Sequence, residues 1–522
     1  MVHPPTPPRT PQDPQTLEEG PPTQTEKVDY LGVVNSLEDV DLDRVDDSDL
    51  VDWDGLDDPE NPRNWSTTKK LITVTLLCLF TYLASAASTI TAYATHAMGR
   101  SFGLRSRGPF EETEYFTDED TITSIFFLGY FLGAVLIAPL AELHGRSPYY
   151  RSCAVFFAAF NIACALSQSI DTIIIFRLIT GIVASCPLIL GPGTVADMFP
   201  AGRRSVPMAA YVVSSMLGTL CGTVSGGSIT TCHGWEWCFW TIAILAAVIS
   251  FVMLFATRES NPRLVLQNKV ARLRRETGNV ELHSPLDSDL NRDALILRSF
   301  SRPWRILGSP AMIGLSLHAT LIYSCFHFYL AWFAPILPVG RKLPLKELGI
   351  AIGIIIGLGV AELIGVALCV VIINRVSARL TARRGGEAQP EYRLPIMILG
   401  TLFVITGLFW WGWSVQNTSH RAMILIGAEI LEGGTFLTYL AFSLYVVDAF
   451  PSYAASAMAA AMIPRALFGF LSPLFDKLKY DIGLGWASSV LAFLAFVFIS
   501  VPILYYRPGH QARRAERQER PF

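Results

Sequence analysis

The sequence predicts an all-α membrane protein with twelve transmembrane helices in two six-helix halves. Hydrophobic residues make up 51% of the 522 positions and charged residues only 16%, against roughly 25% charged residues in an ordinary soluble domain. The charges gather at both ends, in the middle and in short groups between apolar runs. Each apolar run is close to the roughly 20 residues that a helix needs to cross a bilayer.

The apolar runs fall into two sets of six, separated by a polar centre. We expect helices at residues 71–92, 121–142, 149–168, 172–196, 206–230 and 236–256, then at 309–335, 348–373, 394–414, 422–447, 455–476 and 485–506. The corresponding domains are a disordered cytoplasmic tail (1–68), a first half (69–256), a central cytoplasmic loop (257–308), a second half (309–506) and a basic tail (507–522). The tail at 1–68 begins rich in proline and acid, which cannot bury a core.

Lysine and arginine residues favour one side of the predicted bundle, which places both termini and the central loop in the cytoplasm. The loop segment 258–279 interleaves basic residues with Leu and Val. It is interpreted either as an amphipathic helix on the inner leaflet or as a solvated connector. On the outer side, Asn417 begins an Asn-Thr-Ser sequence and is a glycosylation candidate.

A charged group interrupts the apolar pattern between the second and third predicted helices, at APLAELHGR (138–146). Gly145 allows a tight turn with positive φ, and an acid and an arginine at a helix interface can hold two halves together and release them. The segment resembles the G-x-L-x-D-R-x-G-R-R signature of the major facilitator superfamily, which implies a conformational lock formed by Glu142, Gly145 and Arg146. Ala138 and Ser147 depart from that signature, and the missing base at 147 predicts a weaker interlock. The alternative is a polar turn whose charges reach the membrane surface.

The fourth predicted helix contains an arginine inside an apolar stretch. An arginine near membrane depth costs about 2.5–3.5 kcal/mol on insertion scales and is usually paired. Arg177 and Gly181 match the R-x-x-x-G pattern of the same superfamily, and the resemblance implies a role in proton coupling. The alternative is an arginine that snorkels to the outer interface.

The fifth predicted helix carries glycines at Gly218, Gly222, Gly226 and Gly227. Small residues at every fourth position let two helix backbones approach closely. The spacing resembles the glycine signature of antiporters in this superfamily, with Thr223 where that signature has proline. The departure leaves an uptake symporter open.

Longer segments resemble one branch of the superfamily, the fungal twelve-helix drug:proton antiporters. They lie at residues 57–66, 273–279, 390–395 and 447–460. The resemblance runs from about residue 57 to 508 and implies export of small molecules in exchange for protons.

A proton-coupled carrier needs an acid whose proton affinity differs between its two states, and burial favours the protonated form. Glu362, Glu429 and Glu432 lie within predicted helices, and the last two share one helix face. The alternative is a packing interface. Arg465 either pairs with one of these acids, contacts an anionic substrate or makes a structural ion pair; it matches an arginine of the fungal branch. His327 is interpreted as a packed side chain, with a proton relay as the alternative.

The sequence contains no nucleotide-binding G-x-x-x-x-G-K-[ST] loop, no nucleophile motif and no Cys/His metal spacing. We therefore expect neither an enzyme nor a cofactor or metal, and no nucleic-acid partner. Most of the nine cysteines lie in apolar runs, whereas pairing of Cys232 with Cys238 stays open.

The combined prediction is a proton-coupled exporter of hydrophobic or amphiphilic small molecules such as drugs, fungicides or a self-made metabolite. Its expected partners are the substrate, protons and the lipid bilayer, and a monomer is expected. The plasma membrane is the expected location, with the vacuolar membrane as the alternative. An uptake symporter and a non-transporting membrane sensor are the competing functions, because a fold does not fix a function.

Overall fold

The computed structural model describes residues 49–102 (except residue 56), 118–285, 292–336, 345–383, 389–417, 419–471 and 482–506. Leu50–Pro508 form one compact unit. Across the described residues the secondary structure is helical, apart from an isolated β-bridge between Leu50 and His283. Of the expected tail at 1–68, residues 1–48 lie outside the described residues, and so does the basic tail at 507–522.

The helices of the first half follow a short 3₁₀ turn, η3 (Pro62–Asn64). They are α2 (Thr67–Thr89), α3 (Thr95–Ser101), α4 (Asp118–His144), α5 (Arg146–Ala165), α6 (Ile170–Met198), α7 (Ser205–His233) and α8 (Glu236–Ala256). Two helices of the central region follow, α9 (Pro262–Thr277) and α10 (Arg292–Leu307).

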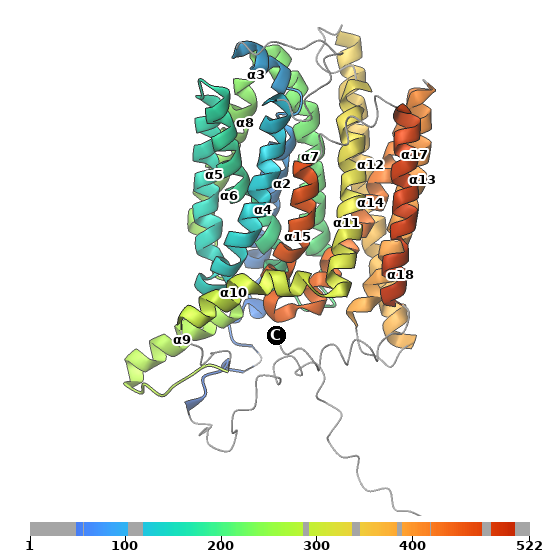
Figure 1. Ribbon diagram of the computed structural model, residues 1–522. Coiled ribbons are helices and arrows are strands. Elements are labelled where there is room, and N and C mark those ends of the chain that lie inside the picture. Colours follow the sequence, from blue (N-terminus) through green and yellow to red (C-terminus); the bar gives the residue numbers. More distant parts are fainter. Residues whose placement is uncertain are drawn as a thin grey trace, which may run out of the picture. The chain divides into compact units, whose positions relative to one another are not determined.

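The second half contains a matching set of long helices (Figure 1). They are α11 (Pro310–Ile336), α12 (Leu345–Arg383), α13 (Leu394–Gln416), α14 (Arg421–Ala449), α15 (Ala454–Phe470), α17 (Leu484–Phe498) and α18 (Ser500–Tyr506), with 3₁₀ turns η4 (Pro390–Arg393) and η5 (Pro451–Tyr453).

The predicted fold class is confirmed, because within the described residues every expected span coincides with a helix; the last part of the expected span 455–476, from residue 472, lies outside them. Among the described residues, eleven helical segments are long and apolar enough to cross a membrane. The twelfth is α5, whose Arg146 and Arg151 lower its mean hydropathy. Two boundaries were wrong: α12 continues ten residues past its expected end, and the last span is divided into α17 and α18 at Ile499.

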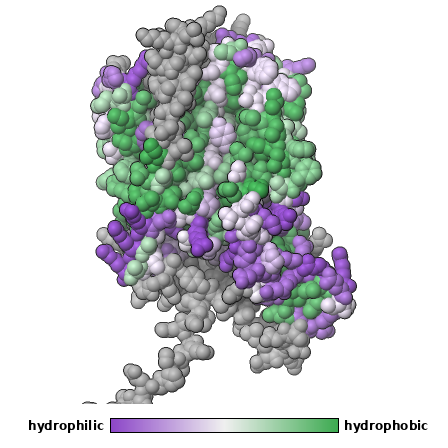
Figure 2. Space-filling view, turned by 180° about the vertical axis from the view of Figure 1, so that it is seen from behind, coloured by the Kyte–Doolittle hydropathy of each residue, from purple (hydrophilic) through white to green (hydrophobic). Residues whose placement is uncertain are grey.

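Helices pack in pairs within each half and also across the halves. In the first half α2 packs against α7, α4 against α6 and α5 against α8; in the second, α13 packs against α14 and α17. Contacts between α4 and α15 join the two halves. The face shown in Figure 2 has a broad apolar band with polar side chains gathered toward one end. Apolar side chains exposed on the helices, such as Phe251 and Phe255 of α8 and Leu504 of α18, suit contact with lipid tails.

The central helix α9 is held by the chain that precedes η3. The Nζ of Lys269 lies 2.8 Å from Asp54 and 3.1 Å from Asp58, and it also donates to the carbonyl of Asp52. Arg272 pairs with Glu60 at 2.8 Å. We call the segment 50–64, which binds α9 through these contacts, the clasp. Both open interpretations of 258–279 were incomplete, because Leu266, Lys269 and Val270 are buried by protein.

The clasp perturbs the titration of its two buried charges. Burial opposes the charge of Asp58, but hydrogen bonds from the backbone N–H groups of Asp54 and Glu60 and from Lys269 outweigh it and lower the pKa of Asp58. Burial also opposes the charge of Lys269, yet its hydrogen bonds to Asp54 and Asp58 raise the pKa of Lys269 above its ordinary value. Both charges are therefore held in the ionised form at neutral pH.

Candidate functional site

The turn between α4 and α5 is built on Gly145, which has φ 94°. Such a backbone angle favours glycine, and a Cβ there would lie 2.5 Å from Oε2 of Glu259. The Glu259 carboxylate accepts hydrogen bonds from the backbone N–H groups of Arg146 (3.0 Å) and Ser147 (2.9 Å). An acid beyond the end of α8 therefore binds the first turn of α5, where a negative charge is favourable.

Arg146 binds within the first half. Its Nη1 lies 2.8 Å from Oδ2 of Asp197 on α6, and Nη2 donates to Oδ1 of Asp197 at 3.3 Å. A further N–H donates to the Thr194 hydroxyl at 3.3 Å. Arg146 thus fixes α5 to α6, whereas the resemblance led us to expect it in a contact between the halves.

Glu142 makes the contact between the halves. One carboxylate oxygen accepts the backbone N–H of Ser456 in the first turn of α15 at 3.0 Å. The other lies 2.5 Å from Nη1 of Arg302 on α10, and the Arg302 guanidinium is 3.9 Å from the centre of the Tyr453 ring. Glu142 therefore joins α4 of the first half to α10 and to the start of α15.

A second contact between the halves was missed from the sequence. Arg204, just before α7, pairs with Asp448 at the end of α14 at 2.6 Å. Arg393 also approaches Asp448, at 3.5 Å. The Ser205 hydroxyl donates to Oδ1 of Asn374 on α12 at 2.7 Å. The signal was present, because Asp448 lies in the segment 447–460 that supported the resemblance. We call the end of the bundle with Glu142 and Asp448 the charged end.

Ser147 occupies the position at which a base was expected. Its side chain is buried and its hydroxyl donates to the Thr257 carbonyl at 3.4 Å. Arg151, one turn along α5, donates to the Thr257 hydroxyl at 2.9 Å and to the Thr257 carbonyl. A cation is thus present near this turn, supplied by Arg151.

Arg177 is fully buried, at 0% exposure, so the snorkelling alternative was wrong. It donates to the carbonyl of Ala87 at 2.8 Å, the hydroxyl of Thr91 at 3.1 Å and the carbonyl of Ile122 at 3.3 Å. Its guanidinium lies 4.2 Å from the Phe126 ring centre. Arg177 therefore fastens α6 to the C-terminal part of α2 and to α4. None of these acceptors is a carboxylate.

The glycines of α7 lie against the backbone of α2. A Cβ would lie 2.3 Å from the Tyr82 carbonyl oxygen at Gly218, 2.4 Å from that of Ala86 at Gly222 and 2.0 Å from that of Ile90 at Gly226. At Gly227 the nearest atom is 3.8 Å away. Three of the four predicted glycines thus form the close helix contact that their spacing indicated, and Gly227 does not.

Glu362 of α12 and Glu429 and Glu432 of α14 lie close enough for their charges to act on one another. Glu362 and Glu432 are buried, and Glu429 is half-buried. We call the three carboxylates the acid cluster. Among the described residues none of them makes an ion pair, and one oxygen of each is buried without a hydrogen-bond partner. The described part of the chain contains no group of three or more His, Cys, Asp and Glu side chains that could hold a metal.

Arg465 of α15 contacts tyrosine side chains and none of the three carboxylates of the acid cluster. It donates to the hydroxyl of Tyr439 on α14, and its guanidinium lies 3.7 Å from the ring centre of Tyr323 on α11. The structure gives Arg465 no ion pair with a described carboxylate, so of the three alternatives only contact with an anionic substrate stays a prediction. His327 packs edge-on against Tyr323 and against Phe127 of the first half.

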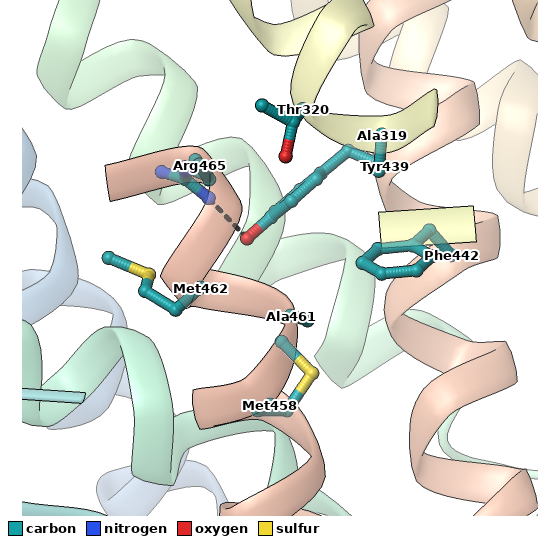
Figure 3. Close-up of a pocket in the computed structure, with 8 residues that line it drawn as sticks. All are labelled: Ala319, Thr320, Tyr439, Phe442, Met458, Ala461, Met462 and Arg465. Carbon is teal, nitrogen blue, oxygen red and sulfur yellow. Dashed lines mark hydrogen bonds between the residues drawn. The ribbon is translucent and has the colours of Figure 1, made fainter. Parts of the chain in front are cut away.

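Arg465 lies in the wall of a pocket between α11, α14 and α15 (Figure 3). We call it the Arg465 pocket. Its lining consists of Ala319, Thr320, Tyr439, Phe442, Met458, Ala461, Met462 and Arg465. The surroundings are largely apolar and flexible, with a guanidinium and two hydroxyl groups as the polar groups. The lining is thus mainly apolar, with one cation in its wall.

Two remaining expectations concern the chain near the opposite end. Asn417 is exposed at the end of α13, whereas the next residue of its sequon lies outside the described residues. Cys232 and Cys238 are both free thiols, and the Cys238 sulfur contacts the Thr230 hydroxyl. Glycosylation at Asn417 stays a prediction.

Comparison with known proteins defines the class. A family model described as Major Facilitator Superfamily matches residues 75–473. The chain is 35% identical over 481 residues to the MFS-type transporter penM of Penicillium rubens, covering 92% of each protein. It is 36% identical over 474 residues to the efflux pump radE of Floropilus chiversii, covering 90% of this chain and 85% of that one. This chain therefore belongs to the major facilitator superfamily.

Solved structures of the same fold agree. The proton:xylose symporter XylE bound to 6-bromo-6-deoxy-D-glucose superimposes with a TM-score of 0.61 at 16% identity, covering 83% of this chain and 95% of that one. At this identity the match shows the fold alone. Fold and relatives together make the protein a multi-pass membrane transporter of small molecules, and not an enzyme.

Proposed function

We propose that the protein exports hydrophobic or amphiphilic small molecules across the plasma membrane in exchange for protons. The buried acid cluster beside the interface of α12 and α14 carries the proposal. Its side chains offer proton sites within the membrane, and the Arg465 pocket offers a separate site for the substrate. The relative radE is an efflux pump, which supports transport of the substrate out of the cell.

The contacts at the charged end hold the two halves together and would act as the gate. Glu142 binds the start of α15 and Arg204 binds Asp448 of α14, so both must break for the two halves to separate at this end. Each contact is a charge-assisted hydrogen bond, worth roughly 1.5–3 kcal/mol. A few such contacts match the few kcal/mol that separate two interconverting conformations. The charged end is proposed to face the cytoplasm, in accord with the positive-inside rule.

Protons would act on the acid cluster by charge neutralisation. A buried, unpaired carboxylate costs several kcal/mol to keep ionised, and two like charges nearby increase that cost. Ionising Glu362, Glu429 and Glu432 together would cost a large amount of free energy. Proton binding and release at the acid cluster would therefore change the relative stability of the transporter's conformations. Moving one proton through 100 mV supplies about 2.3 kcal/mol, which drives more than tenfold accumulation.

Transport can be measured in an efflux-deficient yeast that expresses the full chain. Expression should lower the accumulation of lipophilic compounds, and collapse of the proton gradient should restore it. Unchanged accumulation across the panel, together with uptake of a labelled nutrient, would instead identify an uptake symporter.

The acid cluster is tested in the same cells and in vesicles. Glu432→Gln mimics the protonated form, so it should abolish accumulation against a gradient while exchange of labelled for unlabelled substrate continues. Glu362→Gln and Glu429→Gln test the other members of the cluster in the same way. The matched control is Glu281→Gln at an exposed position, which should behave as the unmodified protein. Full gradient-driven transport in all three variants would remove the cluster as the proton site.

A further inference from the structure

Two buried arginines of the bundle differ in how their N–H groups are used. Arg177 donates to three oxygen acceptors, the carbonyls of Ala87 and Ile122 and the hydroxyl of Thr91, and is 0% exposed. Arg465 is 6% exposed and, among the described residues, has one hydrogen bond, to the Tyr439 hydroxyl. A guanidinium has five N–H donors. Arg177 is satisfied by the fold, whereas the donors of Arg465 remain available at the pocket wall.

A second polar group of the same pocket lacks a partner. Thr320 is 2% exposed, and its hydroxyl oxygen makes no hydrogen bond with the described residues. Threonines elsewhere in these helices, such as Thr401 and Thr438, donate to the carbonyl four residues earlier. In Figure 3 the Thr320 hydroxyl points to the side on which Arg465 and Tyr439 lie. A buried hydroxyl left unbonded costs about 1–3 kcal/mol, so a ligand that bonds it is favoured.

The remaining walls indicate the body of such a ligand. Phe442, Met458 and Met462 present apolar side chains, of which the methionines adapt their shape. The Arg465 guanidinium is stacked at 3.7 Å on Tyr323, which holds its plane in place. The fixed cation is thus combined with a deformable apolar surface.

We infer that the Arg465 pocket selects acidic amphiphiles, in which a carboxylate or similarly planar anion binds Arg465 and Thr320 and an apolar body lies on Phe442, Met458 and Met462. The inference rests on the proposed function, because it names the substrate class of that transporter. An anion would neutralise a buried guanidinium that the described carboxylates do not pair, and it would accept the free hydroxyl of Thr320. A neutral amide of the same shape would give the hydrogen bonds without the charge, and an amine would be repelled.

Binding is tested on the purified full-length protein in detergent, independently of transport. The probes are biphenyl-4-acetate, 2-naphthylacetate and dodecanoate, each compared with its primary amide and with an amine of the same body. The readout is the shift in Tm with ligand concentration, which yields an affinity. The acids should stabilise the protein at concentrations at least tenfold lower than their amides, since a hydrogen bond to a charged group is worth roughly 1.5–3 kcal/mol, or about 10- to 100-fold.

Variants assign the effect to the pocket. Arg465→Gln should weaken binding of the acids by about 10- to 100-fold and weaken the amides much less, because they lose a neutral hydrogen bond and no charge pairing. Thr320→Val, which keeps the shape of the side chain, should weaken the acids by a smaller factor and provides a second test if Arg465→Gln does not fold. Arg275→Gln removes an exposed cation of α9 and is the matched control, with unchanged affinity expected.

The outcomes separate this inference from the proposed export. Amides that bind as tightly as their acids, acids that fail to stabilise the protein, or acids bound equally well by Arg465→Gln and Thr320→Val would each overturn the inference, even if cells export neutral compounds. Acids that bind with the expected dependence on Arg465, but are not exported by cells, would support the inference and contradict the proposed export.

Discussion

The carboxylate of Glu142 accepts a hydrogen bond from the backbone N–H of Ser456 at 3.0 Å, across 314 residues of sequence. The contact joins α4 of the first half to the first turn of α15 in the second. Its other oxygen pairs with Arg302 of the central helix α10. One acid therefore connects the three parts of the chain at the charged end, and the predictions about the gate start from it.

We predict that Glu142→Gln opens the charged end more often. The amide can still accept one hydrogen bond but loses its ionic attraction to Arg302 and to the N-terminus of α15, a loss of about 1–3 kcal/mol. In inside-out vesicles, single cysteines introduced at the charged end should react with a membrane-impermeant thiol reagent several-fold faster. Glu281→Gln, at an exposed position, is the control, and unchanged reactivity in Glu142→Gln would exclude Glu142 from the gate.

Loss of Asp448 should be more damaging than loss of either arginine that it contacts. Asp448→Asn leaves both Arg204 and Arg393 without their carboxylate at a largely buried site, and breaking a buried pair from one side costs roughly 3–5 kcal/mol. Arg204→Gln leaves Asp448 with Arg393. The Tm of purified protein should fall further for Asp448→Asn than for Arg204→Gln, and the reverse order would contradict this assignment.

Two adjacent glycines of α7 should respond very differently to an added methyl group. Gly226→Ala places a Cβ 2.0 Å from the Ile90 carbonyl oxygen of α2, whereas Gly227→Ala has its nearest neighbour at 3.8 Å. Overpacking a close helix contact costs about 1–3 kcal/mol. Gly226→Ala should therefore lower the Tm and the folded yield, while Gly227→Ala stays near the unmodified protein. Equal effects of the two changes would show that α2 and α7 do not approach so closely.

The clasp should hold across neutral pH and loosen at both extremes. The lowered pKa of Asp58 contributes stability that is complete above its unfolded value of about 3.9 and is lost as the pH falls through the folded value. The raised pKa of Lys269 contributes stability that is complete below about 10.4 and is lost as the pH rises through the folded value. The protection factors of the backbone amides of residues 50–64, which correct for the intrinsic rise of hydrogen exchange with pH, should be high and nearly constant between these limits.

A substitution should loosen the clasp at neutral pH as well. Asp58→Asn removes the charge that Lys269 binds in a buried site, so the clasp should exchange hydrogen faster and be cut more readily by protease. Asp57→Asn changes the exposed neighbouring acid and should leave both rates unchanged. Matching protection in the two variants would show that the Asp58–Lys269 pair does not hold the clasp.

The fold was predictable because its signal is distributed over hundreds of residues. Twelve apolar runs of bilayer length leave few alternatives, and the glycine spacing in α7 predicted a close contact that α2 provides. Such patterns repeat along a helix, so one substitution such as Thr223 does not remove them. The helix ends were less accurate, because the polar end of α12 continues the helix beyond the apolar stretch.

The sequence indicated several residues of the site but not their partners. The sequence singled out Glu142, Arg146 and Arg465 as charges within or beside apolar runs, and the structure buries both arginines and leaves Glu142 partly exposed, but their partners come from residues up to 314 positions away. A local pattern does not state which distant helix lies opposite. For that reason the binding of Arg146 to Asp197, the pairing of Arg204 with Asp448 and the lack of a described carboxylate at Arg465 all required the structure.

Glu259 has a mechanical consequence. The Glu259 carboxylate binds the start of α5, and the next helix, α9, is bound by residues 50–64. We therefore expect α9 to move together with the first half when that half tilts. The exposed far end of α9, near Arg275, would then travel through a wider arc than the helices inside the membrane. A spin label at that end, measured against one on the second half, would magnify a small rocking motion into a readily resolved change of distance.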